Sequence, residues 1–291
     1  MELILSDRMG YCGGVSRAIG MVERAIEEAR EKHIPVYSLG KVIHNQRVCS
    51  TFAEQGLKTI TSPSDNPPGL VVLRAHGVPD ALRREFVDAG FTVMDATCPV
   101  VSRNLNLIAE EQKRAEIVII GYENHPETLA MQGVEKEGRS HSSICIASPE
   151  GALQLEKDKQ YSVFVQTTFD RILWKKIQDS LLVLKSQGYG IEFRNEVCPS
   201  SVNRRDAALR LCEKCDAILV VGGKESANTR ALYNLIVDQG KRAWHIETED
   251  EVTPEMKAYG ILGVTAGAST PQLTIDAVLL KLKESEDGHT K

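Results

Sequence analysis

Short apolar runs alternate with longer amphipathic stretches along the whole chain. Parallel strands that are covered on both faces read as continuous apolar segments of this length. The stretches between them, such as 16–31 and 101–114, carry apolar residues at three-to-four spacing, which is typical of helices packed on a sheet. The pattern therefore predicts a parallel α/β fold. The six strands that it predicts are 36–39, 70–73, 117–120, 162–165, 217–221 and 260–264.

The same order of elements occurs three times along the chain. Cys12-Gly-Gly, Cys98-Pro and Cys198-Pro each open a predicted helix. A strand and a first polar loop follow each helix, and another helix and strand lead to a second polar loop. The unit after Cys198 matches the unit after Cys98 with one inserted residue. The first loops hold 44–45, 125–127 and 226–228, and the second loops hold 75–77, 166–168 and 266–269.

Ligands of open parallel sheets bind where the strands end, so all six loops belong to one candidate site. If three lobes face a common axis, their cysteines meet there and the loops surround them. A helix N-terminus also favours the thiolate form of cysteine, which is the form that binds metals. The alternative is coincidence, in which each cysteine is an ordinary residue at the start of a helix. The Cys-Pro and Cys-Gly-Gly sequences are unlike core positions and favour the site.

Length and composition agree with a protein of several small lobes. The chain has 291 residues, of which 42% are hydrophobic and 26% charged, as in soluble globular proteins. The lobes that we expect are 14–97, 98–194 and 195–282, with 1–13 packed centrally and 283–291 as a tail.

The charge pattern excludes several classes of partner. The net charge is −5 and no block of like charges occurs, so neither nucleic acid nor a membrane surface is an expected partner. The start of the chain lacks the basic flank and apolar segment of a signal peptide, and no apolar run is long enough to span a bilayer. We therefore expect a cytoplasmic protein.

The remaining cysteines are predicted to be buried thiols. Seven cysteines, an odd number in a long chain, argue against a disulfide framework. Cys212 and Cys215 have metal-ligand spacing, but they end a predicted helix (204–214) and no second pair completes a site. We interpret them, with Cys49 and Cys145, as small buried hydrophobic residues.

Three thiolates leave one coordination position of a metal site open. With zinc, that position holds a catalytic water. With iron and sulfide, it is one corner of a cubane cluster whose fourth iron is free to bind substrate. The cysteines are far apart in the sequence, unlike the ligands of most structural zinc sites, which favours the cluster modestly.

The polar loops supply hydrogen-bond donors that suit a phosphate or diphosphate. Neither a Walker A motif nor a Gly-x-Gly-x-x-Gly sequence occurs, so a nucleotide is not indicated. Glu127 is the one carboxylate in these loops and is a candidate proton donor, although it also fits an exposed loop glutamate. The donors are His44, His76, His125, Thr167, Thr168, Ser226, Asn228 and Ser269.

These loops resemble a known family, the 4-hydroxy-3-methylbut-2-enyl diphosphate reductases, which catalyse the final step of the non-mevalonate isoprenoid pathway. The matching segments occur in the family's order and cover nearly the whole chain. One such segment is weak evidence, whereas eight in order are specific. They are Tyr11-Cys-Gly-Gly-Val15, Val42-Ile-His-Asn45, Ala75-His-Gly-Val78, Asp95-Ala-Thr-Cys-Pro99, His125-Pro-Glu127, Gln166-Thr-Thr168, Ser226-Ala-Asn228 and Thr265-Ala-Gly-Ala-Ser269.

The resemblance implies a trefoil of three quasi-repeated α/β lobes around a central iron–sulfur cluster. Cys12, Cys98 and Cys198 would hold one 4Fe–4S cluster per chain, and Glu127 would deliver the proton. The family binds the substrate hydroxyl to the open iron and removes it as water after two electrons and two protons arrive, and the products are isopentenyl and dimethylallyl diphosphate. It also implies an electron donor such as ferredoxin or flavodoxin. The implied substrate-binding residues are His44, His76, His125, Thr167, Ser226, Asn228 and Ser269.

The chain departs from the family's pattern at 128–130, at 199–206 and at Ala227, where some members have serine. We expect these departures to affect diphosphate affinity and not the reaction. Two other classes stay open. One is a zinc-dependent hydrolase of a phosphorylated metabolite. The other is an iron–sulfur sensor, although the chain shows no basic helix or partner domain that would serve as its output.

Overall fold

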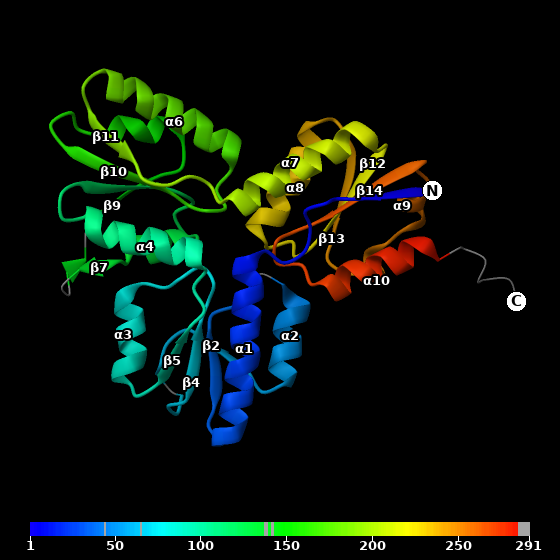
Figure 1. Ribbon diagram of the computed structural model, residues 1–291, viewed down its shortest axis with the longest axis horizontal. Coiled ribbons are helices and arrows are strands. Elements are labelled where there is room, and N and C mark those ends of the chain that lie inside the picture. Colours follow the sequence, from blue (N-terminus) through cyan, green and yellow to red (C-terminus); the bar gives the residue numbers. More distant parts are fainter. Residues whose placement is uncertain (44, 65, 137–138, 141–142, 285–291) are drawn as a thin grey trace, which may run out of the picture. The chain divides into compact units, whose positions relative to one another are not determined.

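The computed structural model describes residues 1–43, 45–64, 66–136, 139–140 and 143–284. Within these ranges the chain forms three four-stranded parallel sheets and one antiparallel hairpin (Figure 1). The chain divides into two compact units. The first unit contains 1–15, 43–50 and the residues from 199 onward, and the second contains 16–42 and 51–198.

The first sheet has the strand order β3-β2-β4-β5. Its two central strands, β2 and β4, are buried at every residue, which explains why they read as apolar runs. The first helix, α1, buries residues at three-to-four spacing, such as Ala18, Val22 and Ala25. The elements are α1 (Gly13–Lys32), β2 (Val36–Leu39), α2 (Gln46–Glu54), β3 (Lys58–Ile60), β4 (Leu70–Leu73), α3 (Asp80–Asp88) and β5 (Thr92–Asp95).

The second sheet has the order β9-β6-β10-β11. Phe164 on β10 packs with Ile117, Ile119 and Met131 in the core on one face. The elements are α4 (Pro99–Glu111), β6 (Glu116–Ile120), α5 (Pro126–Gln132), β7 (Glu135–Lys136), β8 (Arg139–Ser140), β9 (Ser143–Ile146), the 3₁₀ helix η1 (Pro149–Gln154), β10 (Gln160–Val165), α6 (Arg171–Ser186) and β11 (Gly190–Phe193).

The third sheet has the order β13-β12-β14-β1. Alternate residues of β12 enter separate cores, with Leu219 on one face and Ile218 and Val220 on the other. The elements are β1 (Glu2–Leu5), α7 (Pro199–Lys214), β12 (Ala217–Val221), α8 (Ala227–Asp238), β13 (Arg242–Ile246), η2 (Glu249–Glu251), α9 (Pro254–Lys257), β14 (Ile261–Ala266) and α10 (Gln272–Lys283).

The three sheets repeat one topology, so the predicted α/β fold with three repeated lobes is confirmed at the level of the sheets. In the third sheet, the edge strand equivalent to β5 and β11 is β1, from the start of the chain. The sequence pattern did not predict β1 and grouped its residues with a central segment, 1–13. The lobe boundaries themselves stay a prediction.

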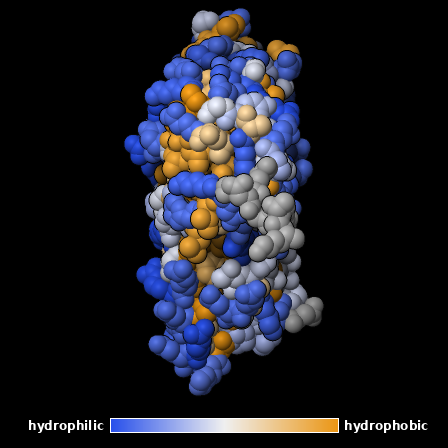
Figure 2. Space-filling view, turned by 90° about the vertical axis from the view of Figure 1, so that its right-hand side faces the viewer, coloured by the Kyte–Doolittle hydropathy of each residue, from blue (hydrophilic) through white to orange (hydrophobic). Residues whose placement is uncertain are grey.

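Side chains at the surface are mixed in character. Figure 2 shows hydrophobic residues among polar ones on the face that it presents, and α10 leaves Leu273 and Leu280 exposed. Scattered exposed leucines are normal in soluble domains. None of the helices in the described ranges has the length and apolar character needed to cross a bilayer.

The pairing of β1 with β14 is testable through one backbone donor. The Ser6 N–H donates to the Val264 carbonyl at 2.8 Å, just beyond β1. We expect Ser6→Pro to lower the free energy of unfolding by about 1–3 kcal/mol relative to Ser6→Ala, because proline removes the donor and leaves the buried carbonyl unpaired. Urea denaturation of the two variants measures the difference, and equal midpoints would show that this contact does not hold the segment in place.

Candidate active site

The three predicted ligand cysteines occupy equivalent positions in the fold. Each directly precedes the first residue of a helix, as expected, and each is half-buried and outside any disulfide. Each also donates its backbone N–H to a carbonyl in one of the second polar loops: Cys12 to Ala268 at 3.2 Å, Cys98 to Ala75 at 2.9 Å and Cys198 to Thr167 at 2.9 Å.

These bonds follow the repeat around the chain. The second loop of the first lobe holds Cys98, that of the second lobe holds Cys198, and that of the third lobe holds Cys12, which lies near the start of the chain. Cys12 belongs to the first compact unit, and Cys98 and Cys198 belong to the second. No set of three His, Cys, Asp or Glu side chains in the described ranges is arranged as a metal site.

The other paired cysteines lie in the core. Cys212 and Cys215 are 7% and 2% exposed and pack against Ile218 and Leu232 beside the third sheet. Burial raises the pKa of both thiols, which disfavours the thiolate that a metal needs. Cys49 and Cys145 are only partly buried, and their Sγ atoms donate to backbone carbonyls.

Glu127 is a buried acid that joins two loops of the second lobe. It lies in the first turn of α5, is 1% exposed, and accepts two hydrogen bonds from one residue. The Thr167 N–H donates to Oε1 and the Thr167 hydroxyl donates to Oε2, both at 2.7 Å. The structure therefore rules out the alternative of an exposed loop glutamate.

Burial controls the proton on Glu127. Loss of solvent raises the pKa of Glu127 to about 7, although both hydrogen bonds from Thr167 favour the carboxylate. A carboxyl group with this pKa both holds and releases a proton near neutral pH, which is the property of an acid catalyst. The Thr167 hydroxyl is able to rotate and accept a hydrogen bond when the acid is protonated.

Gln166 holds the two loops of this lobe together. It is fully buried, and its Oε1 accepts from the Tyr122 N–H at 3.1 Å and from the Thr128 hydroxyl at 3.4 Å. Its Nε2 donates to the Thr168 hydroxyl at 2.9 Å. Thr128, at one of the positions where the chain departs from the family's pattern, thus supports the loop that carries Glu127.

Two of the predicted histidines lie together. His125 caps α5, and its Nδ1 accepts from the Glu127 N–H at 3.1 Å, so a neutral ring carries its proton on Nε2. The rings of His76 and His125 meet edge to face with centroids 5.5 Å apart. His44 lies outside the described residues.

The third lobe gathers the predicted hydroxyl and amide donors. Ser226 caps α8, and the Ser269 hydroxyl lies 3.5 Å from the Ser226 hydroxyl although the residues come from different loops. Nδ2 of Asn228 is buried and has no hydrogen-bond partner among the described residues. A buried N–H without a partner is uncommon and indicates a position where a ligand oxygen would bind.

Glycines allow the loops of this lobe to close. A Cβ on Gly267 would lie 2.0 Å from Oγ1 of Thr229, and Gly222 has a φ of +146°, which side chains rarely adopt. The loops after β12 and β14 therefore approach the start of α8 more closely than any other residue would permit.

Sequence reasoning missed two cations near these loops, the partly buried Arg74 and the buried Arg204. Arg74 directly follows β4, its Nε donates to the Gly77 carbonyl at 3.4 Å, and burial lowers its pKa. Arg204 on α7 is 4% exposed. Burial lowers the pKa of Arg204, and the electrostatic interaction with the nearby Cys12 opposes that shift. The available signal for Arg74 was its position directly after a predicted strand.

A separate pocket of about 400 Å³ in the first unit is unsuited to a diphosphate. It is lined by Glu247, Glu249 and Asp250, and the cation beside them, Arg47, pairs with Glu249 at 2.9 Å. Acidic side chains repel phosphate oxygens. By contrast, Ser226 and Asn228 offer hydrogen-bond donors.

The fold and these loops define a class of protein: a parallel α/β protein with three repeated sheets, a buried acid, and hydrogen-bond donors in the loops after its strands. The family model described as "LytB protein" matches residues 3–283. The chain belongs to this LytB protein family.

Similar proteins carry one name. A 4-hydroxy-3-methylbut-2-enyl diphosphate reductase from Caldanaerobacter subterraneus subsp. tengcongensis is 34% identical over 97% of each chain. One from Treponema denticola is 33% identical over 95% of this chain and 97% of the relative.

Two solved structures are similar over the same length. The E-1-hydroxy-2-methyl-but-2-enyl-4-diphosphate reductase from Plasmodium falciparum is 25% identical, with a TM-score of 0.88 over 98% of this chain and 89% of that one. A second structure is titled (E)-4-hydroxy-3-methyl-but-2-enyl diphosphate reductase, the terminal enzyme of the non-mevalonate pathway. It is 26% identical, with a TM-score of 0.72 over 98% of this chain and 99% of that one.

The raised pKa of Glu127 predicts a specific pH dependence of stability. Folding favours the neutral acid, so the folded chain binds more protons than the unfolded chain between the ordinary value of 4.5 and about 7. The free energy of unfolding should therefore fall by about 3 kcal/mol relative to Glu127→Gln as the pH rises from about 5 to 8. Urea denaturation of metal-free protein at several pH values measures this.

An exposed glutamate is the control for that experiment. Glu110→Gln on α4 should leave the pH dependence as it is in the unmodified chain, because its side chain is in solvent. Parallel pH profiles for the unmodified chain and Glu127→Gln would contradict the burial argument.

Proposed function

We propose that the chain is a 4-hydroxy-3-methylbut-2-enyl diphosphate reductase, the final enzyme of the non-mevalonate isoprenoid precursor pathway. The observation that carries the proposal is the buried pair of Glu127 and Thr167, an acid with a pKa near 7 bonded to a hydroxyl beside the loop that holds Cys198. Membership of the LytB family over nearly the whole chain supports it.

The reaction is a reductive loss of one hydroxyl group. The C–O bond of the allylic alcohol breaks and a C–H bond forms, with the uptake of two electrons and two protons. One proton leaves with the hydroxyl group as water, and the other becomes part of the new C–H bond. The products are isopentenyl and dimethylallyl diphosphate. Glu127 holds one of the protons at its carboxyl group, and the Thr167 hydroxyl lies between that acid and the substrate hydroxyl.

Three thiols are proposed to hold one 4Fe–4S cluster per chain. Cys12, Cys98 and Cys198 have equivalent positions and equivalent backbone bonds, unlike the core cysteines. Arg204 also fits an anionic group, since its buried Nε–H has no partner in the described part of the chain and Cys12 is close by. When bound, such a cluster supplies electrons and a Lewis-acidic iron.

The diphosphate is proposed to bind between loops that donate hydrogen bonds. Ser226, Asn228 and Ser269 supply hydroxyl and amide donors, and His76 and His125 supply ring N–H groups. His44, which the sequence also assigns to substrate, is part of the same proposal without a structural account. The substrate is thereby held by its diphosphate while its hydroxyl end meets Thr167.

The proposal includes an external source of electrons. The family resemblance implies a donor such as ferredoxin or flavodoxin. A cytoplasmic location also stays a prediction.

The cysteine assignment predicts a clear division among variants. Cys12→Ser, Cys98→Ser and Cys198→Ser should each lose the bound iron and sulfide, because an alcohol is a poor ligand for an iron–sulfur cluster. Cys212→Ser and Cys215→Ser, as controls, should retain it even if they are less stable. Iron and sulfide analysis after anaerobic purification decides this. Full iron content in one of the first three variants would remove that cysteine from the ligand set, and bound zinc without sulfide would favour the hydrolase.

Substitution of the acid should lower turnover, whereas substitution of an anion donor should weaken substrate binding. Glu127→Gln keeps the shape of the side chain but removes the proton, so turnover should fall by about two to four orders of magnitude with little change in Kd. Asn228→Ala should mainly raise the Kd, because it removes a donor to the diphosphate. Anaerobic measurement of reduction rate and substrate binding tests both. Turnover at the unmodified rate in Glu127→Gln would show that the proton has another source.

A further inference from the structure

Three arginines occupy equivalent positions in the three repeats. Each lies in the second turn of the helix that a site cysteine opens, with the one-residue insertion of the third repeat taken into account: Arg17 after Cys12, Arg103 after Cys98 and Arg204 after Cys198. A guanidinium group offers five N–H donors in a fixed plane and suits two carbonyl oxygens at once.

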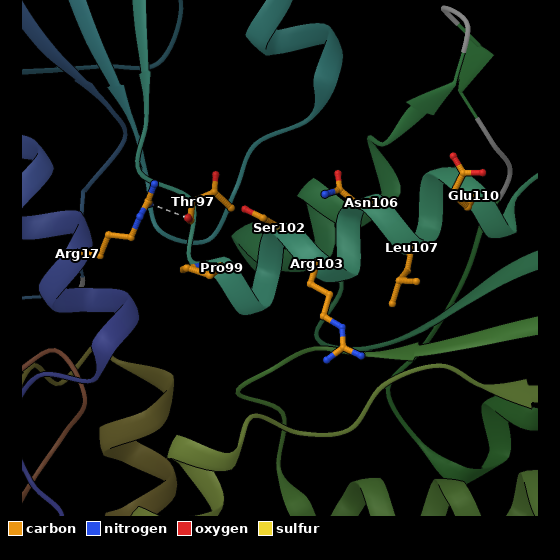
Figure 3. Close-up of a pocket in the computed structure, with 8 residues that line it drawn as sticks. All are labelled: Arg17, Thr97, Pro99, Ser102, Arg103, Asn106, Leu107 and Glu110. Carbon is orange, nitrogen blue, oxygen red and sulfur yellow. Dashed lines mark hydrogen bonds between the residues drawn. The ribbon is translucent and has the colours of Figure 1, made fainter.

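The first of these arginines holds the segment that leads to the next cysteine. Nη1 of Arg17 donates to the Thr97 carbonyl at 3.0 Å, and Nη2 donates to the Asp95 carbonyl at 3.4 Å. Thr97 directly precedes Cys98, and Asp95 lies three residues before it. Figure 3 shows the bond from Arg17 to Thr97. Arg17 therefore belongs to the helix of one cysteine and restrains the position of another.

The third arginine, Arg204, also contacts the segment that leads to a site cysteine, here Cys12 at the start of the chain. Nη1 of Arg204 donates to the Arg8 carbonyl and to the Ala266 carbonyl, both at 3.1 Å. Arg8 precedes Cys12, and Ala266 begins the loop whose Ala268 carbonyl holds the Cys12 N–H. Arg204 thus contacts both the segment that leads to Cys12 and the end of the strand whose loop holds the Cys12 N–H.

The second arginine lacks the equivalent contact. Arg103 makes no hydrogen bond within the described chain, and it extends from α4 at the edge of a pocket of about 590 Å³ that Arg17 and Thr97 also line (Figure 3). The segment that leads to the next cysteine, residues 194–197, has backbone carbonyls that accept no hydrogen bond from the described chain. A free donor and free acceptors thus occur at the one place where the repeat predicts a bond.

We propose that Arg103 is a positioning residue that binds the backbone carbonyls of residues 194–197 and so orients Cys198 when the cysteines hold their cluster. The inference rests on the proposed function, because it assigns the bond to the loaded protein. In this proposal the Arg103 guanidinium group also brings positive charge toward the Cys198 thiolate.

Hydrogen–deuterium exchange distinguishes an effect of Arg103 on the segment before Cys198 from an effect on its own helix. In the cluster-loaded protein, Arg103→Met should raise deuterium uptake several-fold in peptides covering 194–198 and leave 99–105, around the substitution itself, nearly unchanged. Arg17→Met should do the same for 95–98 with or without the cluster. Asn106→Met, one turn along α4 and lining the same pocket, is the matched control and should change neither segment.

The midpoint potential of the cluster is a second readout. It responds to the charge of residue 103, which Arg103→Met removes and Arg103→Lys keeps. The reduced cluster carries one more negative charge than the oxidised cluster, so loss of a nearby positive charge destabilises the reduced form more. Arg103→Met should therefore shift the potential to a more negative value. Arg103→Lys, which keeps the charge, should return it toward the unmodified value. An unchanged potential in Arg103→Met, or unchanged exchange at 194–198 in a loaded protein, would overturn the inference while leaving the proposed function intact. An unmodified chain that binds no iron and sulfide would overturn the proposed function, and this inference with it.

Discussion

A backbone hydrogen bond from each site cysteine to the loop after a central strand determines the geometry of the candidate site. The N–H groups of Cys12, Cys98 and Cys198 all make this bond. Each bond joins the start of a helix to a loop from the carboxyl end of a sheet, so a thiol and polar loop residues are held in one neighbourhood. In the second lobe the accepting residue is Thr167, whose other groups donate to Glu127. Thiol, hydroxyl and acid are therefore connected through a single residue.

The repeat accounts for the position of the first residues of the chain. In the first two sheets, the edge strand that leads to a site cysteine (β5 or β11) follows the other strands of its sheet along the chain. In the third sheet this edge strand is β1, from the start of the chain. This closure puts Cys12 on the loop of the third lobe, although the two are separated by most of the sequence. Arg204 reinforces the closure with its bonds to the Arg8 and Ala266 carbonyls. The start of the chain thus completes the third sheet, and no fourth unit is needed.

The apolar pattern predicted half of the strands of the sheets for a physical reason. All six predicted strands are the central pairs of their sheets, as β2 and β4 are, and central parallel strands are buried on both faces. The strands that it did not name, such as β1 and β5, are edge strands in the described sheets and are partly exposed, so no apolar run marks them. Pairing between distant segments, as for β1, has no local signal.

The candidate residues were readable from the repeat, but their environment was not. Position after a strand selected Glu127 and Thr167, whereas only the packed structure shows that the acid is 1% exposed and bonded twice to Thr167. Burial depends on side chains from several elements, as with Gln166, which bridges both loops. The role of Arg204 was missed because its contacts are carbonyls from distant parts of the chain.

The central claim is that the chain uses a cluster on three cysteines to reduce an allylic diphosphate. Anaerobic purification, with iron and sulfide analysis and a reduction assay on 4-hydroxy-3-methylbut-2-enyl diphosphate in the same sample, tests it most directly. The account predicts iron and sulfide in the amounts of one 4Fe–4S cluster per chain, and substrate-dependent oxidation of a reduced electron donor with isopentenyl and dimethylallyl diphosphate as products. A loaded protein that leaves this substrate unchanged in the presence of reductant, or a protein that binds no iron and sulfide, would contradict it.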